Sequence, residues 1–104
     1  MSEAPQPSVI AIVGPTASGK SALALRVAQA VDAEIVGTDS MQAYRGMNIG
    51  TAKPSETDQR LVRHHMIDVW PVDQAVSVVE FRDRARQAID NVHGRGTRAL
   101  VVGG

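Results

Sequence analysis

A short apolar run followed at once by a glycine-rich loop constrains this chain more than any other feature. Val9–Val13 reads VIAIV, which is apolar on both faces and rich in β-branched residues, as is typical of a buried parallel strand. The next residues, Gly14–Ser21, read GPTASGKS and match the Gly-x-x-x-x-Gly-Lys-Ser spacing of a phosphate-binding loop. The sequence therefore predicts a site for a di- or triphosphate group.

The fixed positions of this loop each have a chemical purpose. Gly14 and Gly19 allow backbone N–H groups to approach phosphate oxygens, because no Cβ stands in the way. Lys20 supplies a mobile positive charge, and the Ser21 hydroxyl is placed to ligate a magnesium ion that bridges phosphate oxygens. A plain glycine-rich turn between a strand and a helix is the alternative. It is disfavoured because all four fixed positions match in the right context.

The rest of the chain alternates helices and strands. The patterns predict a helix over about Lys20–Val31, a strand at Glu34–Gly37, a short helix over about Glu56–Arg63 with Ser55 as N-cap, a strand at His65–Val69, a long helix behind the capping box Ser77-x-x-Glu80, and a strand at Ala99–Val102. This order is typical of an α/β fold, a doubly wound parallel sheet like that of P-loop NTPases. The last strand has no helix after it, so we expect a sheet truncated after about four strands, in the N-terminal part of a longer protein.

Composition excludes several classes of protein. Eleven basic and eleven acidic residues cancel, so no overall attraction to nucleic acid or membrane can be argued. The absence of cysteine excludes disulfides and thiolate metal sites. No apolar stretch approaches the ~18 residues of a membrane span, and the first seven residues do not resemble a signal peptide. We expect a cytoplasmic protein with no membrane partner, in which residues 1–7 form a flexible lead-in.

A second informative stretch follows the second expected strand. Thr38–Arg45 reads TDSMQAYR, and it comes just past a strand end, as the phosphate loop does. In parallel sheets these carboxyl ends line the ligand crevice, so Asp39 can face the bound phosphate. Its carboxylate could act as a general base, as a magnesium ligand, or as a helix cap or turn former.

Five blocks together resemble the tRNA dimethylallyltransferases, also called tRNA isopentenylpyrophosphate transferases. The blocks are Gly14–Ser21, Asp39–Arg45, Ile49–Pro54, His64–Val69 and Val101–Gly104, and they follow the family's order. They cover nearly the whole chain from Ile10 onward. The resemblance implies that residues 8–104 are the N-terminal part of an incomplete P-loop transferase core that is nucleotide-binding and, at full length, monomeric.

Carried over residue by residue, the resemblance implies a site for prenyl transfer to tRNA. The loop Gly14, Pro15, Thr16, Ala17, Ser18, Gly19, Lys20 and Ser21 would hold the pyrophosphate of dimethylallyl diphosphate. Thr16 would lie near the reacting end, and Ser21 would ligate Mg2+. Asp39 would be the base for the exocyclic amine of an adenosine beside the anticodon, and Asp39, Ser40, Met41 and Gln42 would meet the tRNA anticodon loop.

The chain departs from the family pattern at two positions. Ala43 is often a larger apolar residue in the family, and Asn48 is usually Asp. Neither belongs to the phosphate loop, and neither is the proposed base. Lys53 and Arg45 could contact tRNA phosphate or could simply be solvated. His64 and His65 could contact a ligand, but a pair leading a strand is more often structural.

Two other functions compete with prenyl transfer. The loop and sheet alone would also suit a small-molecule kinase that uses ATP, although no cluster of arginines typical of a kinase lid can be identified. A non-catalytic binding fragment is the second alternative, because the chain ends before the rest of any tRNA-binding surface. We therefore expect the 104 residues alone to be inactive or nearly so.

Overall fold

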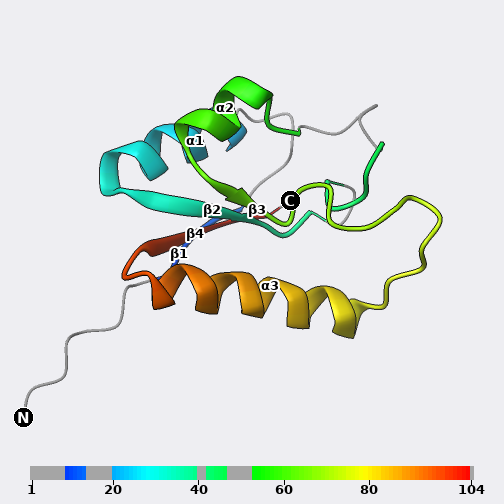
Figure 1. Cartoon of the computed structure of the whole chain (residues 1–104). Helices are drawn as coiled ribbons and strands as arrows, with labels where there is room; N and C mark the ends of the chain where they lie inside the picture. The colour runs from blue at the N-terminus through cyan, green and yellow to red at the C-terminus, as the bar shows by residue number, and fades with distance from the viewer. Residues whose placement is uncertain (1–8, 14–19, 40–41, 47–52, 104) are drawn as a thin grey trace, which may run out of the picture.

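The molecule has three layers, with helices covering both faces of a parallel sheet (Figure 1). A computed structural model describes residues 9–13, 20–39, 42–46 and 53–103. Helices α1 (Lys20–Val31) and α2 (Glu56–Leu61) lie on one face, and α3 (Val78–Gly94) lies on the other. The α/β class expected from the sequence is confirmed.

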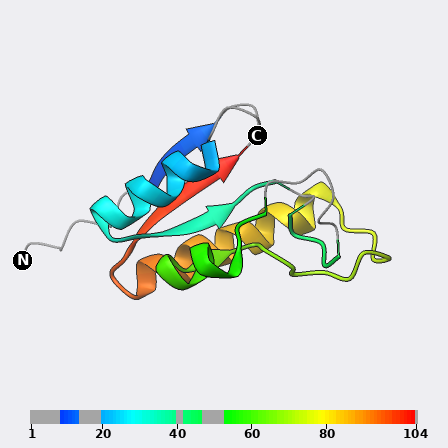
Figure 2. The same cartoon turned by 90° about the horizontal axis from the view of Figure 1, so that it is seen from above.

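The sheet has four parallel strands in the order β1-β4-β2-β3. They are β1 (Val9–Val13), β2 (Ala33–Gly37), β3 (His64–His65) and β4 (Arg98–Gly103). Strand β4, the last in sequence, lies between the first two, and Leu100 is in register with Ile10 on one side and Ile35 on the other. All four strands point the same way, so their carboxyl ends meet at one edge of the sheet (Figure 2).

Two serines begin the second and third helices, as their sequence positions predict. The Ser55 hydroxyl accepts from the Asp58 amide at 3.1 Å, and the Ser77 hydroxyl accepts from the Glu80 amide at the same distance. Each bond satisfies one of the amides that a helix N-terminus leaves without an intrahelical partner. The second helix is shorter than expected, because the backbone at Val62 is already extended.

A hydrophobic cluster fills each space between the sheet and its helices. Between α1 and the sheet the buried residues are Ala24, Ala28, Ala33, Ile35, Val62 and Leu100. Between α3 and the sheet they are Val36, Met66, Ala85, Ala88, Val92 and Ala99. Because successive strand residues face opposite sides, Ile35 and Val36 belong to different clusters. Within the described part of the chain, no helix is long and apolar enough to cross a membrane.

The predicted strand at His65–Val69 is wrong beyond its first residue. Strand β3 covers only His64 and His65, since Met66 has a φ of 69° and Asp68 a φ of 54°. Both values lie in the left-handed region, which an extended strand cannot contain. The chain turns sharply here, and the apolar residues Met66 and Val69 pack against α3 instead of continuing the sheet.

Candidate active site

Lys20 begins α1 at the carboxyl edge of the sheet. Its side chain is buried, and its Nζ donates a hydrogen bond to the Gly103 carbonyl at the end of β4. Beside it, Thr38 donates to the Val102 carbonyl both from its amide, at 2.9 Å, and from its hydroxyl, at 3.1 Å. The ends of β2 and β4 are thereby joined directly beside the lysine that the loop motif provides.

The segment that carries Asp39 leaves β2 and is held by a second segment from elsewhere in the sequence. The Gln42 amide donates to the Asp39 carbonyl at 3.1 Å, which closes a turn. Ala43 is fully buried, and its carbonyl accepts from the amides of Val69 at 2.6 Å and Trp70 at 3.0 Å. A small residue fits here because the two backbones approach closely. The alanine at position 43, where the family often has a larger apolar residue, is consistent with this packing.

Further contacts bind the same two segments together. The Arg45 amide donates to the Trp70 carbonyl at 2.8 Å, and the Asp68 amide donates to the Gln42 carbonyl at 3.1 Å. The rings of Tyr44 and Trp70 lie 6.3 Å apart, within the range of an aromatic pair. This pairing could not be predicted from the sequence, because it depends on the left-handed backbone at Met66 and Asp68.

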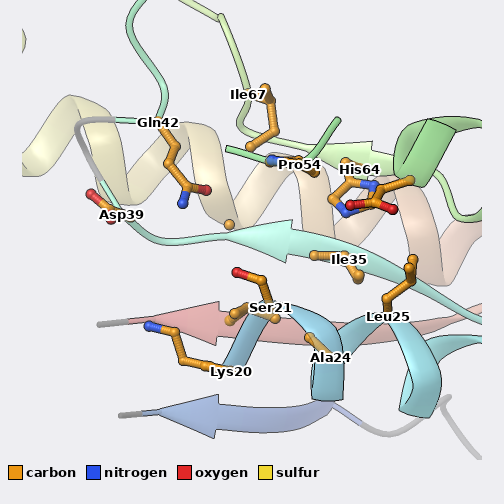
Figure 3. Close-up of a pocket in the computed structure, with 13 residues that line it drawn as sticks. Lys20, Ser21, Ala24, Leu25, Ile35, Asp39, Gln42, Pro54, His64 and Ile67 are labelled. Carbon is orange, nitrogen blue, oxygen red and sulfur yellow. The ribbon is translucent and has the colours of Figure 1, made fainter. Parts of the chain in front are cut away.

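Asp39 and Gln42 line one pocket together with Lys20 and Ser21 (Figure 3). They lie toward the carboxyl edge of the sheet. Apolar residues line the pocket as well: Ala24, Leu25, Ile35, Pro54, Ile67 and Val102. A pocket lined by both charged and apolar side chains suits a ligand with a charged group and a hydrocarbon part.

His64 and Asp58 also line the pocket, which the loop motif did not predict. The Nδ1 atom of His64 lies 2.7 Å from the Val62 carbonyl oxygen, so this nitrogen carries the proton and donates it. Burial lowers the pKa of His64 below 6.5, although the bond to Val62 and the charge of Asp58 partly oppose this. The ring is therefore a neutral imidazole near pH 7.

The neighbouring His65 faces the other side of the sheet. Its Nε2 lies 2.7 Å from a Glu34 carboxylate oxygen, and Arg95 donates to the same oxygen at 2.5 Å. Burial opposes ionisation of Glu34, but the hydrogen bonds from Arg95 and His65 lower the pKa of its carboxyl group below 4.5. His65 thus has a structural role, as expected for one member of the pair.

Some predicted site residues lie outside the described part of the chain. These are Gly14, Pro15, Thr16, Ala17, Ser18, Gly19, Ser40 and Met41, and their roles stay predictions. Asn48 lies outside it as well. Among the residues that are described, no three acidic or histidine side chains are grouped to hold a metal ion.

Comparison with known proteins decides the family. The IPP transferase family profile matches residues 42–104, which is more than half of the chain. The chain belongs to the IPP transferase family. It is 52% identical over 97 residues to a tRNA dimethylallyltransferase of Salinispora arenicola, an alignment that covers 93% of this chain and 28% of that relative.

Solved structures of the family have the same fold. The tRNA isopentenylpyrophosphate transferase of Staphylococcus epidermidis superposes with a TM-score of 0.87 at 44% identity, over 95% of this chain and 33% of that one. A eukaryotic dimethylallyltransferase acting on tRNA superposes with a TM-score of 0.86 at 32% identity, over 93% and 24%. The chain thus spans a third or less of these IPP transferase relatives.

Proposed function

We propose that the protein transfers a dimethylallyl group from dimethylallyl diphosphate to the exocyclic amine of an adenosine next to the tRNA anticodon. The chain belongs to the IPP transferase family, and the main support for the proposal is the set of side chains that line one pocket. The acidic and amide side chains of Asp39 and Gln42 line the same pocket as Lys20 and Ser21. A candidate base and candidate phosphate ligands therefore share one site.

The reaction needs both halves of that site. An exocyclic adenine amine is a weak nucleophile because its lone pair is delocalised into the ring, so a base must take its proton as the carbon–nitrogen bond forms. Asp39 is proposed to accept this proton. The carbon–oxygen bond of the donor breaks, and pyrophosphate leaves with the electron pair and gains negative charge. Lys20 and the amides of residues 14–19 would stabilise that charge.

A magnesium ion is consistent with the side chains present. The Ser21 hydroxyl and the Asp39 carboxylate line the same pocket, and both offer the hard oxygen atoms that Mg2+ prefers. Mg2+ binds with few protein ligands where phosphate oxygens and water complete its shell, so the lack of a larger acidic cluster among the described residues does not count against it. Bound there, the ion would neutralise charge on the phosphate oxygens.

The acceptor base must leave its stack to reach this pocket. Bases in a loop can be splayed out and read by their edges, which is the usual route for enzymes that modify a base. Gln42 is proposed to help here, because its side-chain amide is both a donor and an acceptor beside Asp39. Thr16, Ser40 and Met41 are proposed to complete the site, as the family resemblance implies.

Substitution of the proposed base tests the function. In the full-length gene product that carries this sequence, Asp39→Asn should lower kcat by about 10²–10⁴-fold, while KM for dimethylallyl diphosphate stays within about threefold. The assay measures prenylation of an anticodon stem-loop RNA, with ATP as a control donor that should give no product. Asp73→Asn is the matched control, because Asp73 is exposed in the connection before α3. Full kcat in the Asp39→Asn variant would rule out Asp39 as the base.

A further inference from the structure

Lys53 makes two contacts that tie the Asp39 segment to the turn after β3. Its Nζ donates to the Tyr44 carbonyl at 2.8 Å and to a carboxylate oxygen of Asp68 at 2.5 Å. The Lys53 side chain is only 11% exposed, whereas that of Asp68 is 50% exposed. Lys53 is therefore not a solvated surface lysine, which was one of the two possibilities that its sequence left open.

The Asp68 partner is fixed by its own backbone. Its amide donates to the Gln42 carbonyl at 3.1 Å, and its carbonyl accepts from the Arg45 guanidinium Nε at 3.1 Å. Its φ of 54° places the residue in a left-handed turn that Asp tolerates better than most side chains. The carboxylate is thus held at a defined position, and Lys53 connects it to Tyr44.

A displacement of Tyr44 would be transmitted to the proposed base. Tyr44 follows Ala43 and Gln42, and the Gln42 amide is bonded to the Asp39 carbonyl. The planar peptide units of residues 42–44 and the hydrogen bond from Gln42 to Asp39 limit how far the two ends can move independently. A misplacement of about 1 Å can cost on the order of 10²-fold in rate, because a reacting pair needs near-attack geometry.

We propose that Lys53 and Asp68 are positioning residues, which hold the Asp39–Gln42 turn in the geometry needed for proton removal. This inference rests on the proposed function, since it assigns Asp39 the role of base. Lys53 acts through the Tyr44 carbonyl and the Asp68 carboxylate, and it does not itself touch the reacting atoms. Its ammonium group is the shared donor of the half-buried Tyr44 carbonyl and the half-exposed Asp68 carboxylate, and a neutral side chain would leave the carbonyl without this donor.

The test combines kinetics with a double-mutant cycle in the full-length gene product. Lys53→Met keeps the length of the side chain and removes its charge, and we expect kcat to fall about tenfold with KM for dimethylallyl diphosphate unchanged. In the Asp39→Asn background, Lys53→Met should cause no further loss of the single-turnover rate of prenyl transfer. The carboxylate that Lys53 helps to position is already absent there. Lys53→Arg should restore most of kcat, since a guanidinium can bond both partners.

A second measurement follows the structure without relying on activity. Hydrogen exchange of the amides of Asp68, Val69 and Trp70 should accelerate in the Lys53→Met variant, while the amides of β4 keep their protection. Arg60→Met is the matched control, because it removes an exposed ion pair with Glu56 at 3.9 Å and should change neither readout.

The outcomes separate this inference from the proposed function. Unchanged kcat and unchanged exchange in Lys53→Met, with kcat lost in Asp39→Asn, would overturn the positioning role and leave the base assignment intact. A tenfold loss that persists in the Asp39→Asn background would also overturn it, because Lys53 would then act independently of Asp39. Full activity of Asp39→Asn would instead count against the proposed function itself.

Discussion

The two faces of the sheet are built from the same kinds of apolar residue but carry different polar groups. On the α3 face, Val36 and Val92 are fully buried, and the ion cluster of Glu34, His65 and Arg95 lies beside this packing. On the α1 face, small alanines pack against the strands, and a pocket remains open beside Lys20. The α1 face thus borders the candidate site, whereas the α3 face carries the cluster of Glu34, His65 and Arg95.

The adjacent residues of β3 show this difference most directly. His65 contacts the Glu34 carboxylate beside Arg95, whereas His64 contacts a backbone carbonyl in the pocket wall, where burial lowers the pKa of its ring. The same residue type has different partners because strand alternation places neighbouring side chains on opposite faces of the sheet. Position in the sheet, more than residue type, decides the role.

Matched valine truncations should give the largest difference in stability between the two faces. Val92→Ala removes methyl groups from a fully buried site, and we expect a loss of about 2 kcal/mol in the free energy of unfolding. Val27→Ala in α1 removes the same atoms from a half-buried site and should cost about 1 kcal/mol or less. Urea denaturation measures both. Equal losses would mean that the two faces are equally well packed.

A substitution at the end of β4 should have an effect on stability of comparable size. A Cβ on Gly103 would lie 2.5 Å from the Thr38 hydroxyl oxygen, closer than van der Waals contact allows. Gly103→Ala should destabilise the protein by about 1–3 kcal/mol, because Thr38 must give up its bond to Val102 or the strands must move apart.

A second variant checks the cause of that loss. Thr38→Ala removes the clashing hydroxyl, so the Gly103→Ala and Thr38→Ala pair should lose less stability than the sum of the single variants. Thermal unfolding measures each step. Simple additivity would show that the contact between these residues is not the origin of the effect.

The smallest expected effect is on how stability depends on pH, since His64 on the α1 face and Glu34 on the α3 face titrate over different pH ranges. The folded-state pKa of His64 is lowered, so the unfolded chain binds more protons, and stability falls as the pH drops below about 6.5. The pKa of Glu34 is also lowered, so its contribution is present above about 4.5 and is lost as the pH falls through the folded-state value.

Single substitutions separate the two pH effects. His64→Asn should remove the loss of stability that occurs as the pH falls from about 6.5 to 5, and it should leave the loss at lower pH unchanged. Glu34→Gln should instead weaken the loss of stability at the lower pH. Urea denaturation at pH 8, 5.5 and 4 would show both. A His64→Asn variant with the original loss between pH 8 and 5.5 would contradict the assigned cause.

Much of the fold followed from the sequence because its signals are local. The apolar run at Val9–Val13, the helical stripe of α3 and the caps at Ser55 and Ser77 depend on residues a few positions apart. The phosphate-loop motif fixed where α1 begins, and the family blocks indicated which segments share the site. Strand β3 was predicted poorly, since apolar residues after His65 suggested a strand where left-handed turns occur.

The sequence by itself determined the alternation of helices and strands, the family, and the residues offered as phosphate ligands and base. Only the tertiary structure decided that β4 lies between β1 and β2, that Lys53 meets Asp68, and that neighbouring histidines serve opposite faces. Local patterns specify torsions and amphipathic faces. Contacts between residues far apart in the chain arise only when the packed sheet brings their backbones together, and no local pattern encodes them.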